Sequence, residues 1–339
     1  MKKAFWGFVG ILLLAGLSSQ CLMGQKSSCR LAGTVQLTGD GGWDYLAVDE
    51  VNHHLFISHG SQVNVVDLKK GVQISVIPQT EGVHGIAVAN ALNRAFISCG
   101  RDSSVLVVGL GDFKPIARIQ GTGKNPDAIL YDPFSKKVFT FNGRSSNATV
   151  IDATTLKVIG SIALSGKPEF AQTDGQGKIY VNVEDKSTLV VINVNSLKVE
   201  KEWSIAPGEE PSGLAFDRVN QRLFSVCSNK LMMVSDARSG KIITSCPIGN
   251  GCDGVAFDQG TKRIFASNGE GTITVIQQLS ADKYEVLENF VTQPGARTIT
   301  VDPSTHHLYL SVGEYLPGAD RRRGVKPNTF RVLDIEPAK

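Results

Sequence analysis

The chain has 339 residues, with 35 lysine and arginine residues against 32 aspartate and glutamate residues and a formal net charge of +3. The charges are interspersed and form no basic stripe, which argues against nucleic acid as the main partner, because phosphate neutralisation requires clustered cations. The length suits one large domain or two small ones.

The first predicted element is an N-terminal targeting segment. Two lysines after the initiator methionine precede an apolar core at residues 5–14 and a small polar region at residues 18–20. This pattern is typical of a bacterial secretory signal peptide, and the apolar run is shorter than the roughly 20 residues of a membrane span. We therefore expect a signal peptide over residues 1–24, a mature chain without a transmembrane span, and a periplasmic, cell-surface or secreted location. Cys21 could carry a lipid, but Gln20 stands where lipoprotein signals have a small residue, so a lipoprotein is the less favoured alternative.

After the signal, the chain repeats one unit: a small-residue segment, an apolar strand ending in Asp, a polar turn and a second apolar strand. The copy at residues 210–217 reads Glu-Pro-Ser-Gly-Leu-Ala-Phe-Asp. Seven units follow one another at intervals of 40 to 44 residues, with the ends of their first strands at Asp49, Ala89, Asp132, Asp174, Asp217, Asp258 and Asp302. A period of about 40–45 residues made of four short strands indicates a β-propeller blade. We predict a single all-β domain over residues 25–339, a seven-bladed propeller of four-stranded blades with almost no helix.

The ends of the chain predict how the ring closes. Residues 33–37 form a lone β-like stretch before the first full unit, whose strands are expected at residues 43–48, 55–58, 63–67 and 74–77. The seventh unit has three strands, near residues 298–301, 307–312 and 330–333. We predict that the N-terminal stretch supplies its fourth, outer strand, with Val35 paired into the last blade, because this removes both exposed edges.

Three local features leave alternatives open. The Asp residues that end the first strands are expected to cap the following turns through backbone N–H groups. Cys246 and Cys252 flank a five-residue turn and could form a short disulfide in an oxidising periplasm or remain two buried thiols. Residues 313–328 form a basic, Pro/Gly-rich insertion in unit seven, which is either a solvated loop or a docking site for an acidic partner.

Several unit segments carry a family resemblance. They are Gly166–Phe170, Glu210–Leu214, Asp253–Asp258, Ser267–Thr272 and Gly295–Thr298, with variants of Tyr-Val-Thr-Asn at residues 56–59, 96–99 and 180–183. Over residues 31 to 335 the chain resembles the YVTN-repeat, YncE-like β-propellers. The resemblance implies a secreted or periplasmic repeat protein and leaves its activity open, because function on this fold depends on the site.

The candidate site lies where the inner strands begin, around one mouth of the central channel. One residue from each unit, again 40 to 44 residues apart, should face the axis: Asp44, His84, Asp127, Glu169, Ser212, Asp253 and Arg297. The ends of the second strands add Asn142, Arg144, Glu184 and Asn268 at the same face. We predict that these residues bind an unidentified small ligand or protein partner.

Three interpretations of this mouth stay open. It could be a solvated opening with ion pairs such as Arg297 with Asp253 or Asp44. It could bind a small ligand or a segment of a partner without turnover.

It could also hold Ca²⁺ or another divalent cation through Glu169, Asp127 and Asp253, with Asn142 and Asn268 nearby. His84 or a carboxylate would then act as general base, as in propeller lactonases. We favour a monomeric binding or scaffolding protein; the alternative is a metal-dependent hydrolase or lactonase, for which no catalytic residue can be assigned.

Overall fold

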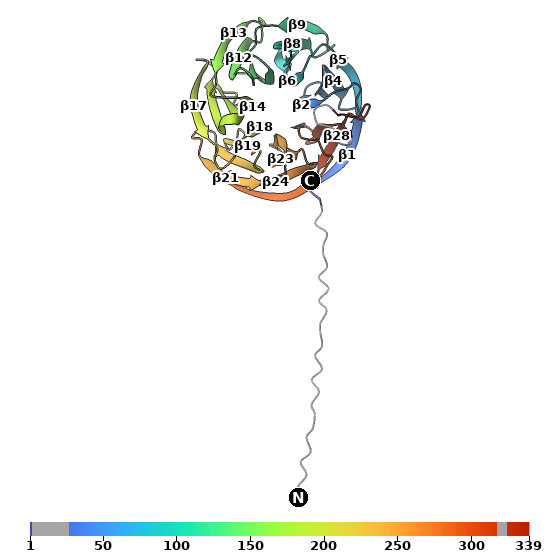
Figure 1. Ribbon diagram of the computed structural model, residues 1–339, viewed down its shortest axis with the longest axis vertical. Coiled ribbons are helices and arrows are strands. Elements are labelled where there is room, and N and C mark those ends of the chain that lie inside the picture. The colour runs from blue at the N-terminus through green and yellow to red at the C-terminus, as the bar shows by residue number, and fades with distance from the viewer. Residues whose placement is uncertain (2–26, 317–323, 339) are drawn as a thin grey trace.

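Seven four-stranded antiparallel sheets surround a central channel (Figure 1). This computed structural model describes Met1, residues 27–316 and residues 324–338. The prediction of an all-β, seven-bladed propeller is confirmed. In these residues helix is limited to two 3₁₀ turns, η1 (Asn90–Leu92) and η2 (Glu184–Lys186). Residues 2–24 of the expected signal peptide lie outside the described part of the chain.

Each blade runs from an inner strand at the channel to an outer strand at the rim. Blades one to three are β2 (Trp43–Asp49), β3 (His54–His59), β4 (Gln62–Asp67) and β5 (Val72–Ile77); β6 (Val83–Ala89), β7 (Arg94–Cys99), β8 (Ser104–Gly109) and β9 (Pro115–Ile119); and β10 (Pro126–Asp132), β11 (Lys137–Asn142), β12 (Asn147–Asp152) and β13 (Val158–Ala163). Blades four to six are β14 (Pro168–Thr173), β15 (Lys178–Val183), β16 (Thr188–Asn193) and β17 (Lys198–Ser204); β18 (Pro211–Asp217), β19 (Arg222–Cys227), β20 (Leu231–Asp236) and β21 (Ile242–Pro247); and β22 (Cys252–Asp258), β23 (Arg263–Asn268), β24 (Thr272–Ser280) and β25 (Lys283–Val291).

The seventh blade joins the two ends of the chain. It consists of β26 (Ile299–Val301), β27 (Leu308–Val312), β28 (Arg331–Pro337) and, at its outer edge, β1 (Cys29–Gln36). Val35 lies opposite Val332, and the Leu37 N–H donates to the Phe330 carbonyl at 2.9 Å. The predicted closure by the N-terminal strand is confirmed.

In five of the seven units a small residue follows the ring position: Gly85, Ala128, Gly213, Gly254 and Thr298. A Cβ on Gly213 would lie 3.0 Å from the Asp253 carbonyl of the next blade, and one on Gly254 would lie 2.9 Å from the Ile299 nitrogen. Because neighbouring inner strands approach this closely, larger side chains have no room at Gly213 or Gly254. The equivalent positions of blades one and four hold Tyr45 and Phe170, whose rings meet edge to face. Glycine therefore allows the blades to converge and places the residues just before it around one opening.

The core lies between the blades and repeats with them. A phenylalanine in the second strand of most blades is fully buried: Phe56, Phe96, Phe139, Phe224 and Phe265. Burial of such a side chain contributes roughly 1.5–3 kcal/mol. The repeated aromatic layer therefore holds each blade against its neighbour at the same height.

The Asp residues that end the inner strands cap the turns as predicted and also join blades. Asp132 accepts the Ser135 N–H at 2.9 Å and the hydroxyl of Thr173, in the next blade, at 2.7 Å. Asp258 is almost fully buried and meets Nδ1 of His306 at 2.9 Å. These carboxylates are structural and lie away from the channel mouth.

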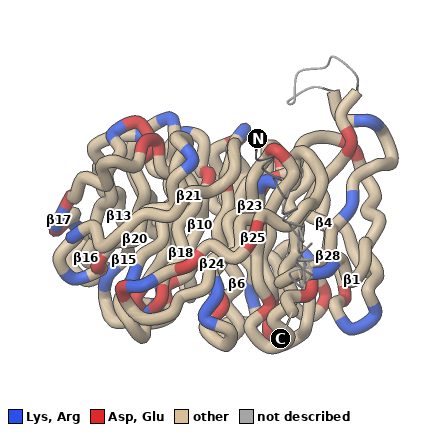
Figure 2. The backbone as a smooth tube through the Cα atoms, turned by 90° about the horizontal axis from the view of Figure 1, so that it is seen from below, with Lys and Arg blue, Asp and Glu red and all other residues tan. Residues whose placement is uncertain are grey.

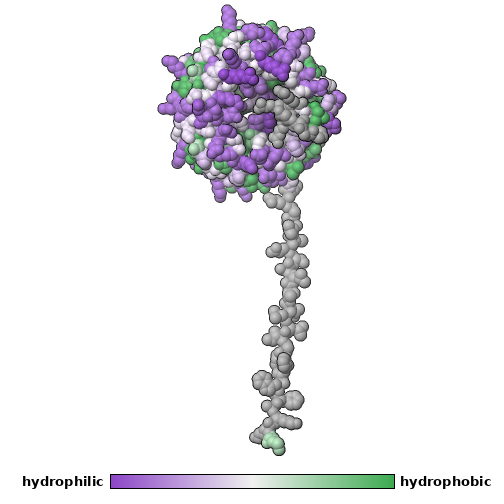
Figure 3. Space-filling view, viewed as in Figure 1, coloured by the Kyte–Doolittle hydropathy of each residue, from purple (hydrophilic) through white to green (hydrophobic). Residues whose placement is uncertain are grey.

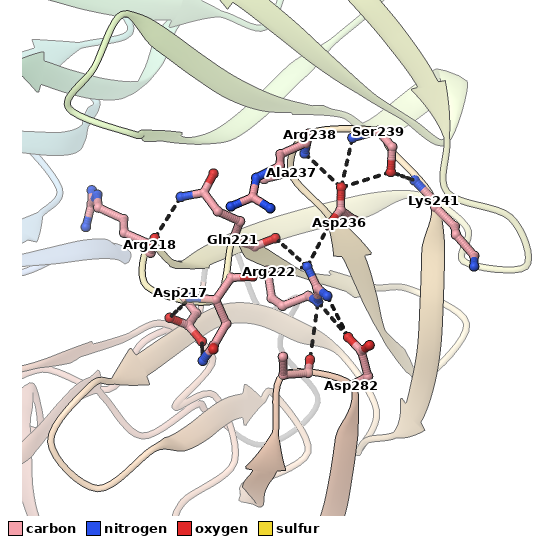
Figure 4. Close-up of polar contacts among 12 residues, drawn as sticks. Asp217, Arg218, Gln221, Arg222, Asp236, Ala237, Arg238, Ser239, Lys241 and Asp282 are labelled. Atoms are coloured by element: carbon pink, nitrogen blue, oxygen red, sulfur yellow. Dashed lines mark hydrogen bonds and ion pairs between the residues drawn. The ribbon is translucent and has the colours of Figure 1, made fainter.

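Blades five and six are further joined by Arg222, whose side chain is 11% exposed. Its guanidinium contacts Asp236 of its own blade at 2.7 Å and Asp282, in the β24–β25 turn, at 2.6 Å (Figure 4). It also donates to the backbone carbonyl of Ala281 at 3.2 Å. One half-buried cation thus bridges a strand and the outer hairpin of the adjacent blade.

The structure also bears on the Cys246–Cys252 pair and on the insertion of unit seven. Cys246 and Cys252 are free, buried thiols that pack in the same apolar cluster, so the disulfide alternative is wrong. Burial raises the pKa of both thiols and keeps them protonated. In the insertion, Tyr315 and Val325 form a β-bridge at the base, whereas residues 317–323, with the three arginines, lie outside the described residues.

Charged positions of both signs are mixed over the body of the ring (Figure 2). On the face seen in Figure 3, hydrophilic residues surround the centre of the ring. In the part of the chain that the structure describes, no helix has the length and apolar character to cross a bilayer.

Candidate functional site at the channel mouth

A pocket of about 560 Å³ occupies the channel mouth. Its wall is formed by the starts of the inner strands and by the loops that follow the second strands. Six of the seven residues chosen by register line it: Asp44, His84, Asp127, Glu169, Asp253 and Arg297. Glu184 lines it as well.

The other candidates lie elsewhere. Ser212 is 8% exposed and donates its hydroxyl to the Cys252 carbonyl at 3.2 Å, a contact between neighbouring inner strands. Asn142 and Asn268 are fully buried and donate to threonines of their own blades, Thr149 and Thr274. Arg144 is exposed and does not line the pocket.

Arg297 neutralises one side of the mouth. Its Nε lies 2.7 Å from Oδ2 of Asp253, and Nη2 lies 3.6 Å from Oδ1 of Asp44. Nη2 also donates to the Trp43 carbonyl at 3.0 Å. Both carboxylates therefore share one cation, the pairing that the sequence suggested.

His84 lies between two carboxylates from the neighbouring inner strands. Its Nδ1 is 2.7 Å from Oδ2 of Asp44 and 3.6 Å from Oδ1 of Asp127. Burial lowers the pKa of His84, but the hydrogen bond with Asp44 and the charges of Asp127, Asp44 and Glu169 outweigh it and raise the pKa to about 9. The imidazole is therefore cationic at neutral pH.

Lys167 neutralises the opposite side. It directly precedes β14, and its Nζ lies 2.5 Å from Oε1 of Glu169 and also contacts Glu184. Burial and the negative charge of Asp127 still raise the pKa of Glu169, against the effect of Lys167. For Asp127, burial again raises the pKa, and the nearby carboxylates of Asp44 and Asp253 add to it.

The charges of the pocket do not balance. Five carboxylates line it (Asp44, Asp127, Glu169, Glu184 and Asp253), and three cationic side chains lie among them (His84, Lys167 and Arg297). A fourth cation, Arg101, also lines the pocket; its side chain is 77% exposed and lies 4.0 Å from Glu81. One carboxylate is therefore in excess, and the pKa values of Asp127 and Glu169 are raised.

Comparison with known proteins supports the fold and the resemblance. No family model matches the chain. Over 104 residues, which span 30% of this chain and only 29% of the relative, it is 29% identical to the uncharacterized protein YncE of Salmonella typhi. The chain therefore resembles YncE over part of its length.

Solved structures share the propeller fold of this chain at low sequence identity. Hydrazine synthase of Kuenenia stuttgartiensis matches with a TM-score of 0.69 and 17% identity, over 81% of this chain and 94% of that chain. The WD40 repeats of RRP9 match with a TM-score of 0.76 and 9% identity, over 91% and 98% of the two chains. At these identities the likeness shows the fold alone.

The sequence pattern did not indicate two kinds of residue that line the pocket. Lys167 lies two positions before the ring residue of its unit, where four of the other six units have glycine, and this departure was a usable signal. The aromatic residues Trp43, Tyr45 and Tyr315 also line the pocket. Tyr315 comes from the insertion of unit seven and packs on Trp43 with ring centroids 5.6 Å apart, so no repeat position could have indicated it.

Proposed function

We propose that this protein is an exported binding propeller whose channel mouth takes a small cationic ligand. The observation that carries the proposal is the excess of carboxylates over cationic side chains in the pocket, together with the burial of Asp127 and Glu169. Buried carboxylates without a counter-charge are costly, and they hold protons instead. A cationic ligand would replace those protons and supply the missing charge.

The composition of the wall supports this ligand class. The carboxylates of Asp127 and Glu169 come from adjacent blades, and the negative charge of Asp127 helps to raise the pKa of Glu169. Trp43 and Tyr45 add aromatic faces beside them. Carboxylates together with aromatic rings are the groups that recognise amines and other organic cations.

The test uses the purified mature chain, residues 25–339, and isothermal titration with 1,4-diaminobutane. Glutarate, a dianion of similar length, serves as the matched probe of opposite charge. We expect the diamine to bind and glutarate not to bind, and Glu169→Gln to weaken diamine binding on the order of 10-fold, since a charge-assisted hydrogen bond is lost. Equal binding of both probes, or an unaffected Glu169→Gln variant, would contradict the proposal.

Export is part of the same proposal and has its own test. Mass spectrometry of the protein recovered from a bacterial periplasm should give a chain that begins near residue 25. A chain that stays in the cytoplasm with its first 24 residues intact would refute export and leave the proposed binding site unaffected.

Metal-dependent hydrolysis is the second candidate, favoured by the donor atoms of Asp44, His84 and Asp127, which all lie within 4.8 Å of one another. Such an enzyme would require a bound metal for turnover. Hydrolysis of simple lactones that is lost with EDTA and restored by added metal would support it, and turnover that persists in EDTA would exclude it.

A further inference from the structure

Three side chains of the mouth come together more closely than the rest. Asp44, His84 and Asp127 occupy equivalent positions on β2, β6 and β10, the inner strands of three consecutive blades. One donor atom from each lies within 4.8 Å of the other two. The position of each is set by a rigid strand, and the side chains are only partly exposed.

Competition from other charges is weaker in this trio than at the remaining carboxylates: Asp44 meets Arg297 only at 3.6 Å. Glu169 is engaged by Lys167, and Asp253 is engaged by Arg297. Asp127 has no such partner: within the described residues its one ion pair is with His84, at 3.6 Å. The metal set expected from the sequence, Glu169 with Asp127 and Asp253, thus contains two carboxylates that already hold cations.

The distances in the trio suit a metal ion. Two ligand atoms that each lie about 2.1 Å from one metal, at angles of about 90–110°, are separated by about 3.0–3.4 Å. The observed separations of His84 Nδ1 from the two carboxylates, 2.7 Å and 3.6 Å, lie on either side of that range. All three donor atoms lie within 4.8 Å of one another, so movement of the carboxylate side chains is needed to complete the geometry.

We propose that the channel mouth holds one divalent transition-metal ion, bound by Asp44, His84 Nδ1 and Asp127. This inference rests on the proposed cation-binding function and names the cation. A metal on His84 Nδ1 displaces the proton of that nitrogen, which leaves the five carboxylates against Arg101, Lys167 and Arg297, and a dication matches that difference of two. An imidazole nitrogen favours Zn²⁺ or a similar first-row ion over Ca²⁺, which takes six to eight oxygen ligands.

The surroundings hold the ligands in place. The Asp44 carbonyl accepts the Thr298 hydroxyl at 2.8 Å, and Arg297 approaches the carboxylate oxygen that does not contact His84. The imidazole packs on Gly100, where a Cβ would lie 2.9 Å from the ring. Three protein ligands leave coordination positions that open into the pocket, where a ligand or water could complete the shell.

The experiment is titration of the metal-free mature chain with Zn²⁺, and with Co²⁺ followed by visible absorption, which reports the ligand set. We expect one equivalent to bind and EDTA to remove it. His84→Gln and Asp127→Asn should each weaken binding by about 10-fold or more. The control is His307→Gln, which removes another histidine–aspartate pair, that with Asp334, outside the pocket. Circular dichroism and thermal melting establish that each variant is folded.

The outcomes separate the two proposals. Zn²⁺ binding that is equally strong in His84→Gln and in the wild type, or absent from the wild type, overturns the metal site. In a second outcome, the metal fails to bind, 1,4-diaminobutane binds, and Glu169→Gln weakens diamine binding. The mouth then binds organic cations, and only the proposed metal site is refuted. If neither probe binds, both proposals fall.

Discussion

His59 should make the closed ring less stable in acid. It ends β3, is fully buried, and its ring stacks on Phe330 with centroids 3.8 Å apart. Within the described residues neither ring nitrogen has a hydrogen-bond partner. Phe330 also accepts the Leu37 N–H at the join between the first and last blades, so protonation of His59 places an uncompensated charge at the closure.

The sign and size of the effect follow from the pKa. Burial lowers the pKa of His59 below 6.5. Part of this decrease is offset by nearby polar groups and by the carboxylate of Asp40. The polar groups belong to Asn64, Thr38 and Gly41 and lie outside hydrogen-bond geometry. The unfolded chain therefore protonates this histidine near pH 6.5, whereas the folded chain does so only at lower pH. The free energy of unfolding falls as the pH drops below 6.5. At about 1.36 kcal/mol per pH unit, the loss between pH 6.5 and pH 5.0 is at most about 2 kcal/mol.

Denaturant unfolding of the wild type and His59→Leu at pH 5.0 to 7.5 measures this loss. Groups such as Asp127 and Glu169, whose pKa values are raised, titrate alike in both chains and cancel in the difference. We expect the variant to gain up to about 2 kcal/mol relative to the wild type between pH 7.5 and pH 5.0. His53→Asn, a half-buried histidine with φ of 56° that asparagine tolerates, is the control. Parallel stability curves for the wild type and His59→Leu would refute the reasoning.

Three further changes test the framework by denaturant unfolding or thermal melting. Deletion of residues 27–36 removes β1 and leaves β28 as an exposed edge, so we expect a large fall in melting temperature and aggregation; an unchanged melt would contradict closure. Asp132→Ala should lower the free energy of unfolding by about 2–3 kcal/mol, because buried donors including Thr173 lose their acceptor. A decrease of less than about 0.5 kcal/mol would contradict the capping role of Asp132. Arg222→Met should cost about 2 kcal/mol through the loss of contacts with Asp236 and the next blade, and a neutral result would show that the ion pairs do not stabilise the join.

The sequence predicted the framework well because every unit repeats the same physical requirements. A blade needs four strands, and the seventh unit supplies three. The strand that contains Val35 completes this blade, with Val35 opposite Val332. The caps at Asp132 and its equivalents follow from the turn chemistry of one residue type.

The site was predicted less completely because register along a strand does not determine which way a side chain points. Successive side chains alternate between the faces of a sheet, so a residue near the mouth can still point into its blade. Asn142 and Asn268 do so, and each is buried against threonines. Lys167 lies before its strand, in a segment whose path the repeat pattern does not specify.

The mouth is where the seven units differ most in chemistry, and its charges are not needed to build the ring. Ser212 shows what packing alone requires at this position, a small buried residue that bonds to the next inner strand. The other six positions carry an acid, an imidazole or a guanidinium. Burial raises the pKa of Asp127 and Glu169, so part of their charge is suppressed in the unliganded protein. Keeping these carboxyl groups buried lowers the stability of the unliganded protein, and a bound cation would remove this cost. The residues that destabilise the empty ring are therefore those that would bind its ligand.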